Sequence, residues 1–467
     1  MKKILSILFS VLLFSLLGIN CFANSGLSYW QGSSNGGSIL FDKECPIEVE
    51  KEKLIFDIPE FASTYYESTD DFLSYSASVT AQYTFKNPAN YDVKATLSFP
   101  FGTIPSYAYY EDFKVDTEKY DITINNNKIK KNLRHTLFTG YDFFDFEYEG
   151  KKLHDSYVED DFYSPDMPVK VYIFEAKIDN NGTSCYVSTS FSKSEVNEQK
   201  TKLILSDCWG YEYIDNKVST GLSIENLGLI YLYVIGDDIL TMPEWKIYEN
   251  SSKEKEVENA SVDYFFTDDR TFKDIATMFH LEETTYISEV DWYNATVDYL
   301  NSQKSDEFFL GSDLDIKFSP YQFMRWYQYD IEIGAGEKIL NSVTAPLYPT
   351  IDEGYEPEVY EYNYLLSPAK SWRKFGKLDI EIKTPYNLIK NNLGKFEKDV
   401  ESFTISFDTL PSNDLNFKLS TVENPKKIWQ PMQIAYEILV LIIIIMTAVI
   451  ISMLIIIIVL LVKRKRK

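Results

Sequence analysis

The sequence predicts a mainly β protein with antiparallel β-sandwich domains, a small helical insert and one C-terminal transmembrane helix. Apolar and polar residues alternate in many short segments, and Pro, Gly and Asn turns separate these segments. Residues 438–462 then form an uncharged apolar run of 25 residues. Alternation with a period of two gives a strand one buried face, and regularly spaced strands of this kind are typical of sandwiches.

The clearest alternation lies at 79–85 and 93–99, on either side of the turn Asn87-Pro88, and predicts a β-hairpin. Further strands are expected at 122–124, 169–178, 229–235, 262–266, 323–333, 339–345, 360–366, 378–382, 403–407 and 415–419. We therefore expect an N-terminal β-sandwich domain over 46–268, with a long aromatic and acidic insertion at 138–168. A C-terminal β-sandwich domain is expected over 306–421.

Residues 269–305 interrupt the strand pattern and are predicted to be helical. Val290, Tyr293, Val297 and Leu300 recur at the spacing of one helix face. Ser288, three residues before Asp291, resembles the start of a capping box. We expect this helix to dock through its apolar face onto a sheet, because an isolated helix of this length is marginal in water.

The N-terminus has the pattern of a cleaved signal peptide over 1–23. Two lysines precede an uncharged apolar run, and Cys21 and Ala23 fit the small-x-small cleavage pattern. Cys21 also leaves open a lipoprotein, in which the lipidated cysteine becomes the first residue. The Gly-, Ser- and Asn-rich residues that follow predict a flexible leader over 24–45.

The C-terminal run at 438–462 is predicted to be a transmembrane helix. At ~1.5 Å rise per residue it exceeds the ~30 Å hydrocarbon core of a bilayer. The basic tail 463–467 follows at once, and such residues stay in the cytoplasm. We therefore expect a single-pass protein of the cell membrane with its bulk outside the cell, a stalk at 422–437 and a cytoplasmic C-terminus.

The exterior portion is strongly acidic. The chain carries a net charge of −24, and its two ends hold seven positive charges, which leaves −31 on the remainder. A surface of this charge is repelled by nucleic acids, so no nucleic-acid partner is expected. Scattered carboxylates that keep a surface protein soluble explain the same composition.

Three cysteines follow the expected cleavage site. Segments 186–191 and 201–205 look like two strands around a polar turn, and antiparallel pairing about that turn places Cys185 opposite Cys208. We therefore predict a Cys185–Cys208 disulfide with Cys45 unpaired, which is chemically allowed outside the cell. Three unpaired thiols are the alternative.

No motif for catalysis or metal binding stands in a convincing context. Residues 32–36 fit the letters of a nucleophile elbow, but they lie in the leader, without a strand before and a helix after them. Asp313 and Asp315 leave open a contribution to a calcium site. We predict no catalytic residue, no cofactor site and no metal site, and hence a protein that is not an enzyme.

Two stretches resemble known proteins. Val79-x-Ala81-x-Tyr83-x-Phe85-x-Asn87 with Phe99-Pro100-Phe101 resembles the opening of VIT-type β-sandwich modules, although the Asp-x-Ser-x-Ser adhesion motif that often follows them is absent. The segments 291–295, 324–327, 345–349 and 366–376 are similar to an uncharacterised family of secreted, single-span, membrane-anchored proteins of clostridia-like bacteria. That resemblance implies an anchored exterior and no particular activity.

These observations favour a non-enzymatic cell-surface protein that binds a partner or serves the envelope structurally. The expected partner is a cell-envelope protein or glycan. The alternative is an envelope carbohydrate-binding protein or glycan hydrolase. A hydrolase needs two converging carboxylates, whereas a sugar-binding protein commonly offers exposed coplanar aromatic rings. A signalling receptor is a third option, for which the tail 463–467 is too short to act alone.

Overall fold

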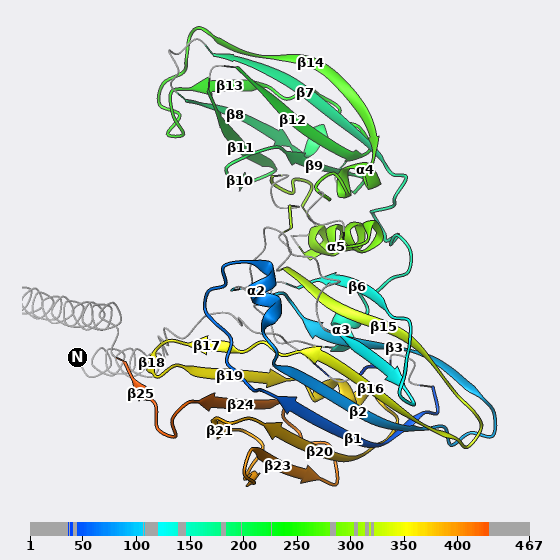
Figure 1. Cartoon of the computed structure of the whole chain (residues 1–467). Coiled ribbons are helices and arrows are strands. Elements are labelled where there is room, and N and C mark those ends of the chain that lie inside the picture. The colour runs from blue at the N-terminus through cyan, green and yellow to red at the C-terminus, as the bar shows by residue number, and fades with distance from the viewer. Residues whose placement is uncertain are drawn as a thin grey trace, which may run out of the picture.

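The computed structural model describes residues 36, 38–40, 44–105, 107, 120–138, 146–178, 184–197, 199–225, 227–280, 286–302, 307–312, 317–318 and 322–428. The predicted signal peptide, transmembrane helix and basic tail lie outside these residues. Within the described ranges, no helix has both the length and the apolar character needed to cross a bilayer. The chain is mainly β, and Figure 1 shows a large and a small β module with helix α5 between them.

The large module consists of the described residues of 36–138 and 322–428. Its first layer is an eight-stranded sheet in the order β22-β23-β20-β1-β2-β16-β4-β5. These strands are β22 (Glu397–Lys398), β23 (Ser402–Phe407), β20 (Phe375–Lys383), β1 (Glu48–Asp57), β2 (Ser78–Lys86), β16 (Lys338–Pro346), β4 (Asp121–Ile124) and β5 (Asn127–Lys128). Strands β1 and β20 are parallel, so this sheet is mixed and not purely antiparallel as expected.

Two smaller sheets form the opposing layer. One has the order β3-β15-β6, and the other has the order β17-β19-β24-β21. Their strands are β3 (Val93–Gly102), β15 (Phe323–Ile333), β6 (Asn132–Leu137), β17 (Thr350–Asp352), β19 (Val359–Tyr364), β24 (Leu415–Ser420) and β21 (Asn387–Asn391). Apolar side chains from both layers form one core, in which Phe56 of β1 packs edge-on against Tyr364 and Phe417. Helix α2 (Thr69–Ser74) contributes Phe72 to this core, and the 3-10 helix η6 (Ser367–Ser371) follows β19.

The sheet pairing corrects the predicted domain division. Strand β1 pairs with β20, and β3 pairs with β15, so residues from both ends of the chain share one module. The strands at 79–85 and 93–99 are confirmed, but they do not form a hairpin. β2 pairs with β1 and β16 in one layer, whereas β3 pairs with β15 in the other. Alternation shows which face of a strand is buried and does not identify the neighbouring strand.

The predicted leader is not loose throughout. Gly36 forms a parallel bridge with Leu365, and Ile39 forms an antiparallel bridge with Ser98. Between them Ser38 is fully buried, and its backbone N–H donates to the Tyr83 hydroxyl at 3.0 Å. Gly36 and Ile39 therefore join the two small sheets into one layer. The predicted stalk also begins later than expected, because β25 (Lys426–Lys427) pairs with β18 (Tyr355–Glu356).

The small module consists of the described residues of 168–271 and 307–312 and is a sandwich of two four-stranded sheets. One has the order β10-β11-β8-β13, and the other has the order β14-β7-β12-β9. Their strands are β10 (Tyr211–Ile214), β11 (Lys217–Ile224), β8 (Cys185–Ser192), β13 (Trp245–Tyr248), β14 (Ala260–Thr271), β7 (Pro168–Ile178), β12 (Leu227–Gly236) and β9 (Thr201–Leu205). The turn η2 (Lys193–Glu195) follows β8. All strand pairs in both sheets are antiparallel.

In this arrangement β8 and β9 do not form the hairpin from which the disulfide was predicted. β8 pairs with β11 and β13, whereas β9 pairs with β12 in the opposite sheet. Cys185 and Cys208 are both buried in the core between the sheets, and neither forms a disulfide in the described structure. Cys45 is buried in the large module, again without a disulfide. The register argument failed because the turn at 192–200 crosses between sheets instead of closing one ladder.

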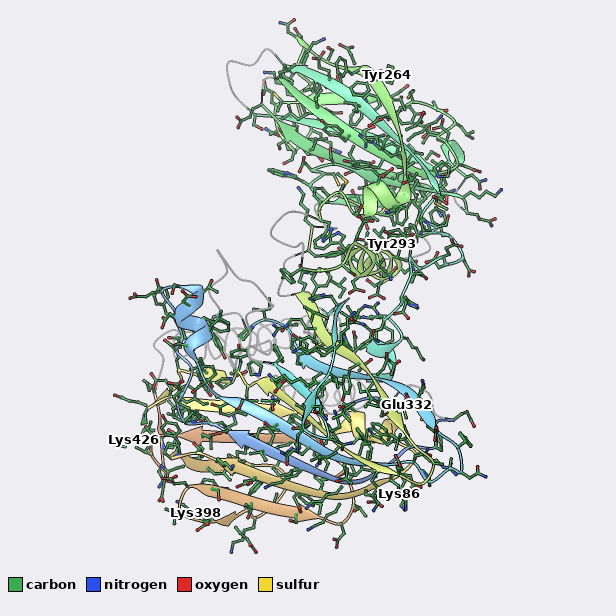
Figure 2. All side chains as sticks on the ribbon, turned by 45° about the vertical axis from the view of Figure 1, so that its right-hand side comes forward. Lys86, Tyr264, Tyr293, Glu332, Lys398 and Lys426 are labelled. Atoms are coloured by element: carbon green, nitrogen blue, oxygen red, sulfur yellow. The ribbon has the colours of Figure 1, made fainter. Side chains whose placement is uncertain are left out.

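The predicted helix is confirmed as α5 (Glu289–Ser302), preceded by the short helix α4 (Phe272–Ala276). Tyr293, Val297 and Leu300 are buried against the outer face of β14-β7-β12-β9. Val290 is only half-buried, whereas Trp292 packs on the opposite side with residues of the large module. The helix is thus buried on two sides because it lies between the modules, which Figures 1 and 2 both show.

Residues 146–167, which make up most of the described part of the insertion predicted at 138–168, join the modules. It contains one short helix, α3 (Phe146–Gly150), and no strand. Its backbone and side chains bond to α5: the Asn294 side chain accepts from the Val158 N–H at 2.9 Å and donates to the Ser156 carbonyl at 3.0 Å. We call residues 146–167 the connector below.

Candidate functional site

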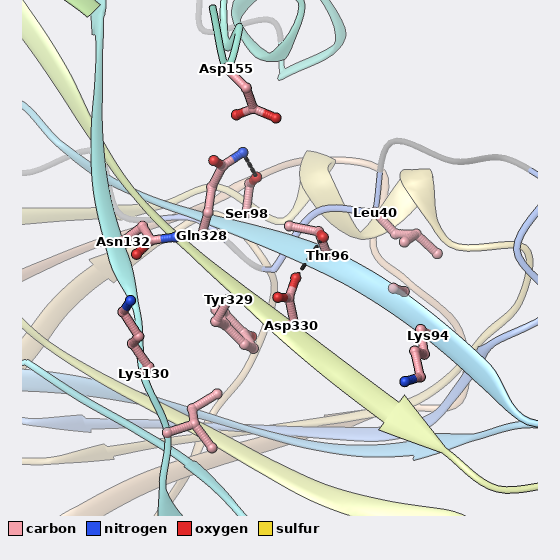
Figure 3. Close-up of a pocket in the computed structure, with 12 residues that line it drawn as sticks. Leu40, Lys94, Thr96, Ser98, Lys130, Asn132, Asp155, Gln328, Tyr329 and Asp330 are labelled. Atoms are coloured by element: carbon pink, nitrogen blue, oxygen red, sulfur yellow. Dashed lines mark hydrogen bonds between the residues drawn. The ribbon is translucent and has the colours of Figure 1, made fainter. Parts of the chain in front are cut away.

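A polar groove lies over the outer face of the three-stranded sheet β3-β15-β6. It encloses about 870 Å³ and is lined by Leu40, Lys94, Ala95, Thr96, Ser98, Ile129, Lys130, Asn132, Asp155, Gln328, Tyr329 and Asp330. Figure 3 shows Asp155 of the connector above the sheet and Leu40 at its far side. The sheet contributes polar side chains because Leu97 and Tyr329 point into the core, so their neighbours Thr96, Gln328 and Asp330 point outward.

Cross-strand pairing arranges the polar side chains in rows. Thr96 is opposite Asp330, and its hydroxyl donates to Asp330 Oδ1 at 2.7 Å. Gln328 lies between Ser98 and Asn132, and its amide donates to the Ser98 hydroxyl at 3.2 Å (Figure 3). These two hydrogen bonds hold the polar side chains on the floor of the groove in fixed positions.

Two groups on the groove wall are not engaged. Within the described structure, the side chains of Lys130 and Asn132 form no hydrogen bond or ion pair with the protein, and both are exposed. Lys94 has an ion pair with Glu332 at 3.2 Å, but both side chains are largely exposed, which makes that pair weak. The groove thus offers an amide, hydroxyls and charges of both signs to a ligand.

Arg134, the outward-facing residue after Asn132 on β6, links the groove to α5. Its Nε and Nη2 each donate to Asp291 Oδ1 at 3.0 Å. Its Nη1 donates to Asp155 Oδ1 and Gln328 Oε1, both at 2.8 Å, and both acceptors line the groove. Nη2 also donates to the carbonyl of His154. A single guanidinium therefore contacts the groove, the connector and α5, a role suited to its planar set of donors.

The Asp291 side chain is buried, and only 2% of it is exposed. Burial raises the pKa of this carboxyl, and the hydrogen bond from Arg134 opposes that effect. The backbone N–H of His135 donates to Asp291 Oδ2 at 2.9 Å, so both carboxylate oxygens accept hydrogen bonds. A buried carboxylate is tolerated only with such partners.

His135 is neutral and does not serve as the counterion of Asp291. Burial, together with the charges of Arg325 and Arg134, lowers its pKa to about 3. Its Nδ1 lies 4.0 Å from Asp291 Oδ2, and neither ring nitrogen has a hydrogen-bond partner in the described part of the chain. A histidine in this state supports the core and has no access to the groove.

We expect Asp291→Asn to destabilise the contact between α5 and the large module. The substitution keeps the shape of the side chain but turns one of its two accepting oxygens into a donor, which leaves Arg134 or the His135 N–H without an acceptor. The expected cost is about 2 kcal/mol. Calorimetry of the full-length chain would show a lower midpoint. Asp330→Asn, an exposed carboxyl with one hydrogen bond, is the matched control and should change stability by less than about 0.5 kcal/mol. Equal midpoints for both variants would contradict this role for Asp291.

The groove does not include the residues singled out from the sequence. Cys185 and Cys208 lie in the core of the small module. His280, which follows α4 by four residues, is also outside the groove, and its Nε2 lies 2.9 Å from the Ile287 carbonyl. Asp313 and Asp315 lie outside the described residues. Residues 32–35, which fit only the letters of a nucleophile elbow, lie outside them as well. No cluster of His, Cys, Asp and Glu suited to a metal ion occurs within the described ranges.

A second cavity of about 620 Å³ lies at the edge of the eight-stranded sheet. Its lining is acidic, with Asp57, Glu381, Asp399 and Glu401. Glu381 already has an ion pair with Lys53 at 2.8 Å. Clustered carboxylates of this kind are usually a solvated face, and this cavity offers less varied chemistry than the groove.

Comparison with known proteins gives little guidance. No protein family's sequence profile matches the chain, and no curated protein matches it. Among solved structures, it is similar to a candidate nutrient-binding protein from Legionella pneumophila, at 9% identity and a TM-score of 0.35. That match covers 83% of this chain and 71% of the other. A similarity at this level carries no argument about function.

Sequence reasoning missed the groove because its residues look like ordinary exposed positions of strands. One signal was available. The segment 128–134 contains four basic residues, Lys128, Lys130, Lys131 and Arg134, and no carboxylate, in a strongly acidic chain. Ile129, Lys130 and Asn132 of this segment line the groove, and Arg134 adjoins it. A local reversal of charge is therefore a signal at this strand, although residues 370–377 show the same one.

Proposed function

We propose that this chain is a membrane-anchored extracellular binding protein, not an enzyme, and that it holds a small polar ligand in the groove over β3-β15-β6. The observation that carries the proposal is the combination of a groove of about 870 Å³ with unengaged Lys130 and Asn132 on its wall. Binding sites need a concave surface and a few placed polar groups, and this groove provides both. The proposed extracellular location is based on the signal-peptide pattern at 1–23 and the apolar run at 438–462.

The groove suits a binding role better than glycan hydrolysis. Its two lining carboxylates already have partners: Asp155 binds Arg134, and Asp330 accepts from Thr96. A glycosidase needs one carboxyl as acid and the other as base or nucleophile on either side of a bond. The only aromatic residue in the described lining is Tyr329, whose hydroxyl is buried and donates to Asn341 Oδ1 at 2.9 Å. The groove therefore offers no stacking platform for sugar rings, so recognition relies on hydrogen bonds and charge.

We expect one class of small polar compound to raise the thermal midpoint of the full-length chain in detergent. Hexoses, hexuronates, amino acids and dipeptides are the probes, because the lining presents amide, hydroxyl and both charges. A ligand at 100 times its Kd stabilises a folded protein by about 2.7 kcal/mol. Thr96→Trp fills the exposed floor of the groove and should abolish the shift.

The matched control is Ser402→Trp, which places the same ring in the second, acidic cavity. It should respond to the compound as the wild type does. Failure of all four classes to stabilise the wild type would contradict the proposed function. An unchanged response in Thr96→Trp would contradict the proposed site.

A further inference from the structure

The groove over β3-β15-β6 contains two charges that have no counterion. The charged residues of its lining are Lys94, Lys130, Asp155 and Asp330. Lys94 has its ion pair with Glu332, and Asp155 has one with Arg134. Lys130 and Asp330 carry opposite charges, yet neither has an ion pair in the part of the chain that the structure describes. The groove therefore presents one unpaired positive and one unpaired negative charge.

The Thr96 hydroxyl keeps these two charges apart. Thr96 is on β3, Asp330 is on β15, and Lys130 precedes β6, on the other side of β15. The hydroxyl donates to Asp330 Oδ1 at 2.7 Å, which draws the carboxylate towards β3 and away from Lys130. Figure 3 shows the Thr96–Asp330 pair and Lys130 on opposite sides of β15. Asp330 Oδ2 has no partner among the described residues, so it is open to a donor from a ligand.

Asn132 adds a second donor at the positive end of the groove. It follows Lys130 by two residues, lines the groove as well, and lies opposite Gln328 in the ladder between β6 and β15. Its unengaged amide and the Lys130 ammonium together offer a donor to each oxygen of a carboxylate. The negative end, at Asp330, calls for a donor that is itself positively charged.

We propose that the ligand is a zwitterion, whose carboxylate binds Lys130 and Asn132 and whose ammonium group binds Asp330 Oδ2. This inference rests on the binding function proposed above. Neighbouring strands are about 4.8 Å apart, so the two ends of the site lie roughly 5 to 10 Å apart across β15. That span accommodates a free amino acid or a dipeptide, with a charge-assisted hydrogen bond of about 2.8 Å at each end.

The unpaired charges disfavour other ligand classes. A purely anionic ligand would satisfy Lys130 but would be repelled by Asp330. A neutral ligand would remove water from both charges without supplying a counterion to either, which costs free energy. A zwitterion is the class that neutralises both ends of the site at once.

Ligand derivatives test the class. The common amino acids and alanyl-alanine are added singly to the full-length chain in detergent, and binding is measured by thermal midpoint and titration calorimetry. The compound with the largest effect is then compared with its carboxyl amide and its N-acetyl form. Each derivative should bind at least tenfold more weakly, because each lacks one charge that the site neutralises. Tighter binding of alanyl-alanine than of any amino acid would identify a peptide as the natural form of the ligand.

Two substitutions test the orientation. Lys130→Gln should bind the parent compound and its amide equally, but should still prefer the free amine to the N-acetyl form. Asp330→Asn should show the reverse pattern. Lys217→Gln and Asp215→Asn are the matched controls, because they remove the same charges at exposed positions beside the turn between β10 and β11, and both preferences should persist. A purely structural effect would weaken all three compounds alike.

The outcomes separate this inference from the proposed function. If a hexose or a hexuronate binds and no amino acid or alanyl-alanine does, the ligand is not a zwitterion, although the groove is still a binding site. If none of these compounds binds, both proposals fail. Unchanged preferences in Lys130→Gln and Asp330→Asn would overturn the roles assigned to these two residues.

Discussion

Glu52→Gln is expected to stabilise the large module at pH 8 by up to roughly 5 kcal/mol, and to leave its stability unchanged below about pH 4.5. Glu52 lies in the core between the layers with 1% of its surface exposed. Burial raises the pKa of its carboxyl from 4.5 to about 8, and the hydrogen bond from Tyr83 only partly opposes this. Its Oε1 has no hydrogen-bond partner within the described structure.

The direction follows from the proton balance. The unfolded chain releases the Glu52 proton above pH 4.5, whereas the folded chain keeps it until about pH 8. Folding therefore takes up a proton in this interval, and the stability present below pH 4.5 is lost progressively as the pH rises to 8. Glutamine has a similar shape and no proton to release, so the variant lacks this loss.

Calorimetric midpoints of both chains between pH 4 and 8.5 measure the effect. The difference between variant and wild type should grow with pH, and contributions from His135, whose folded pKa is about 3, cancel in that difference. Glu50→Gln is the control on the same strand. Glu50 is near Lys338 and Lys86, and its lowered pKa predicts no gain at high pH. A difference that does not depend on pH would contradict a buried neutral Glu52.

Val297→Asp is expected to cost about 4 kcal/mol or more, because it places a charge without a partner between α5 and the small module. Val297 is 2% exposed and packs with Tyr293 and Leu300 against the sheet that contains β7 and β12. In the Val297→Asp chain, calorimetry should show earlier unfolding, and hydrogen exchange should be faster throughout α5.

The matched control introduces the same change at an exposed valine. Val400 is 90% exposed in the turn before β23, so Val400→Asp should alter stability by less than about 0.5 kcal/mol. Asp298 on α5 is not a neutral site, because it has an ion pair with Lys152 of the connector at 3.1 Å. Comparable midpoints for Val297→Asp and Val400→Asp would mean that α5 is not docked through Val297.

Local sequence pattern was sufficient to predict the elements but not their partners. Strands such as β2, β15 and β24 and the helix α5 follow from alternation and helical spacing, because burial of one face fixes that spacing. The pairing of β1 with β20 joins residues 326 positions apart, such as Val49 and Phe375, and nothing in either segment specifies the other. The predicted hairpins failed for this reason, and the predicted disulfide failed with its hairpin.

The candidate site could not be predicted for a similar reason. Arg134 and Asp291 are 157 residues apart in sequence and meet only because α5 returns to the large module. Polar residues such as Thr96 and Gln328 are indistinguishable from solvated strand positions until Asp155 of the connector and Leu40 enclose the space above them. A groove forms only when the layers of the protein assemble. The sequence around each of its residues therefore carries almost no sign of it.

Hydrogen–deuterium exchange of the full-length chain, with and without the polar compound that stabilises it, is the most direct test of the groove as the ligand site. We expect exchange to slow at 129–132 on the groove wall and at 153–156 of the connector. Exchange should stay unchanged around the second cavity at 381–385 and 399–402. Slower exchange at the second cavity, with none at 129–132, would contradict this assignment.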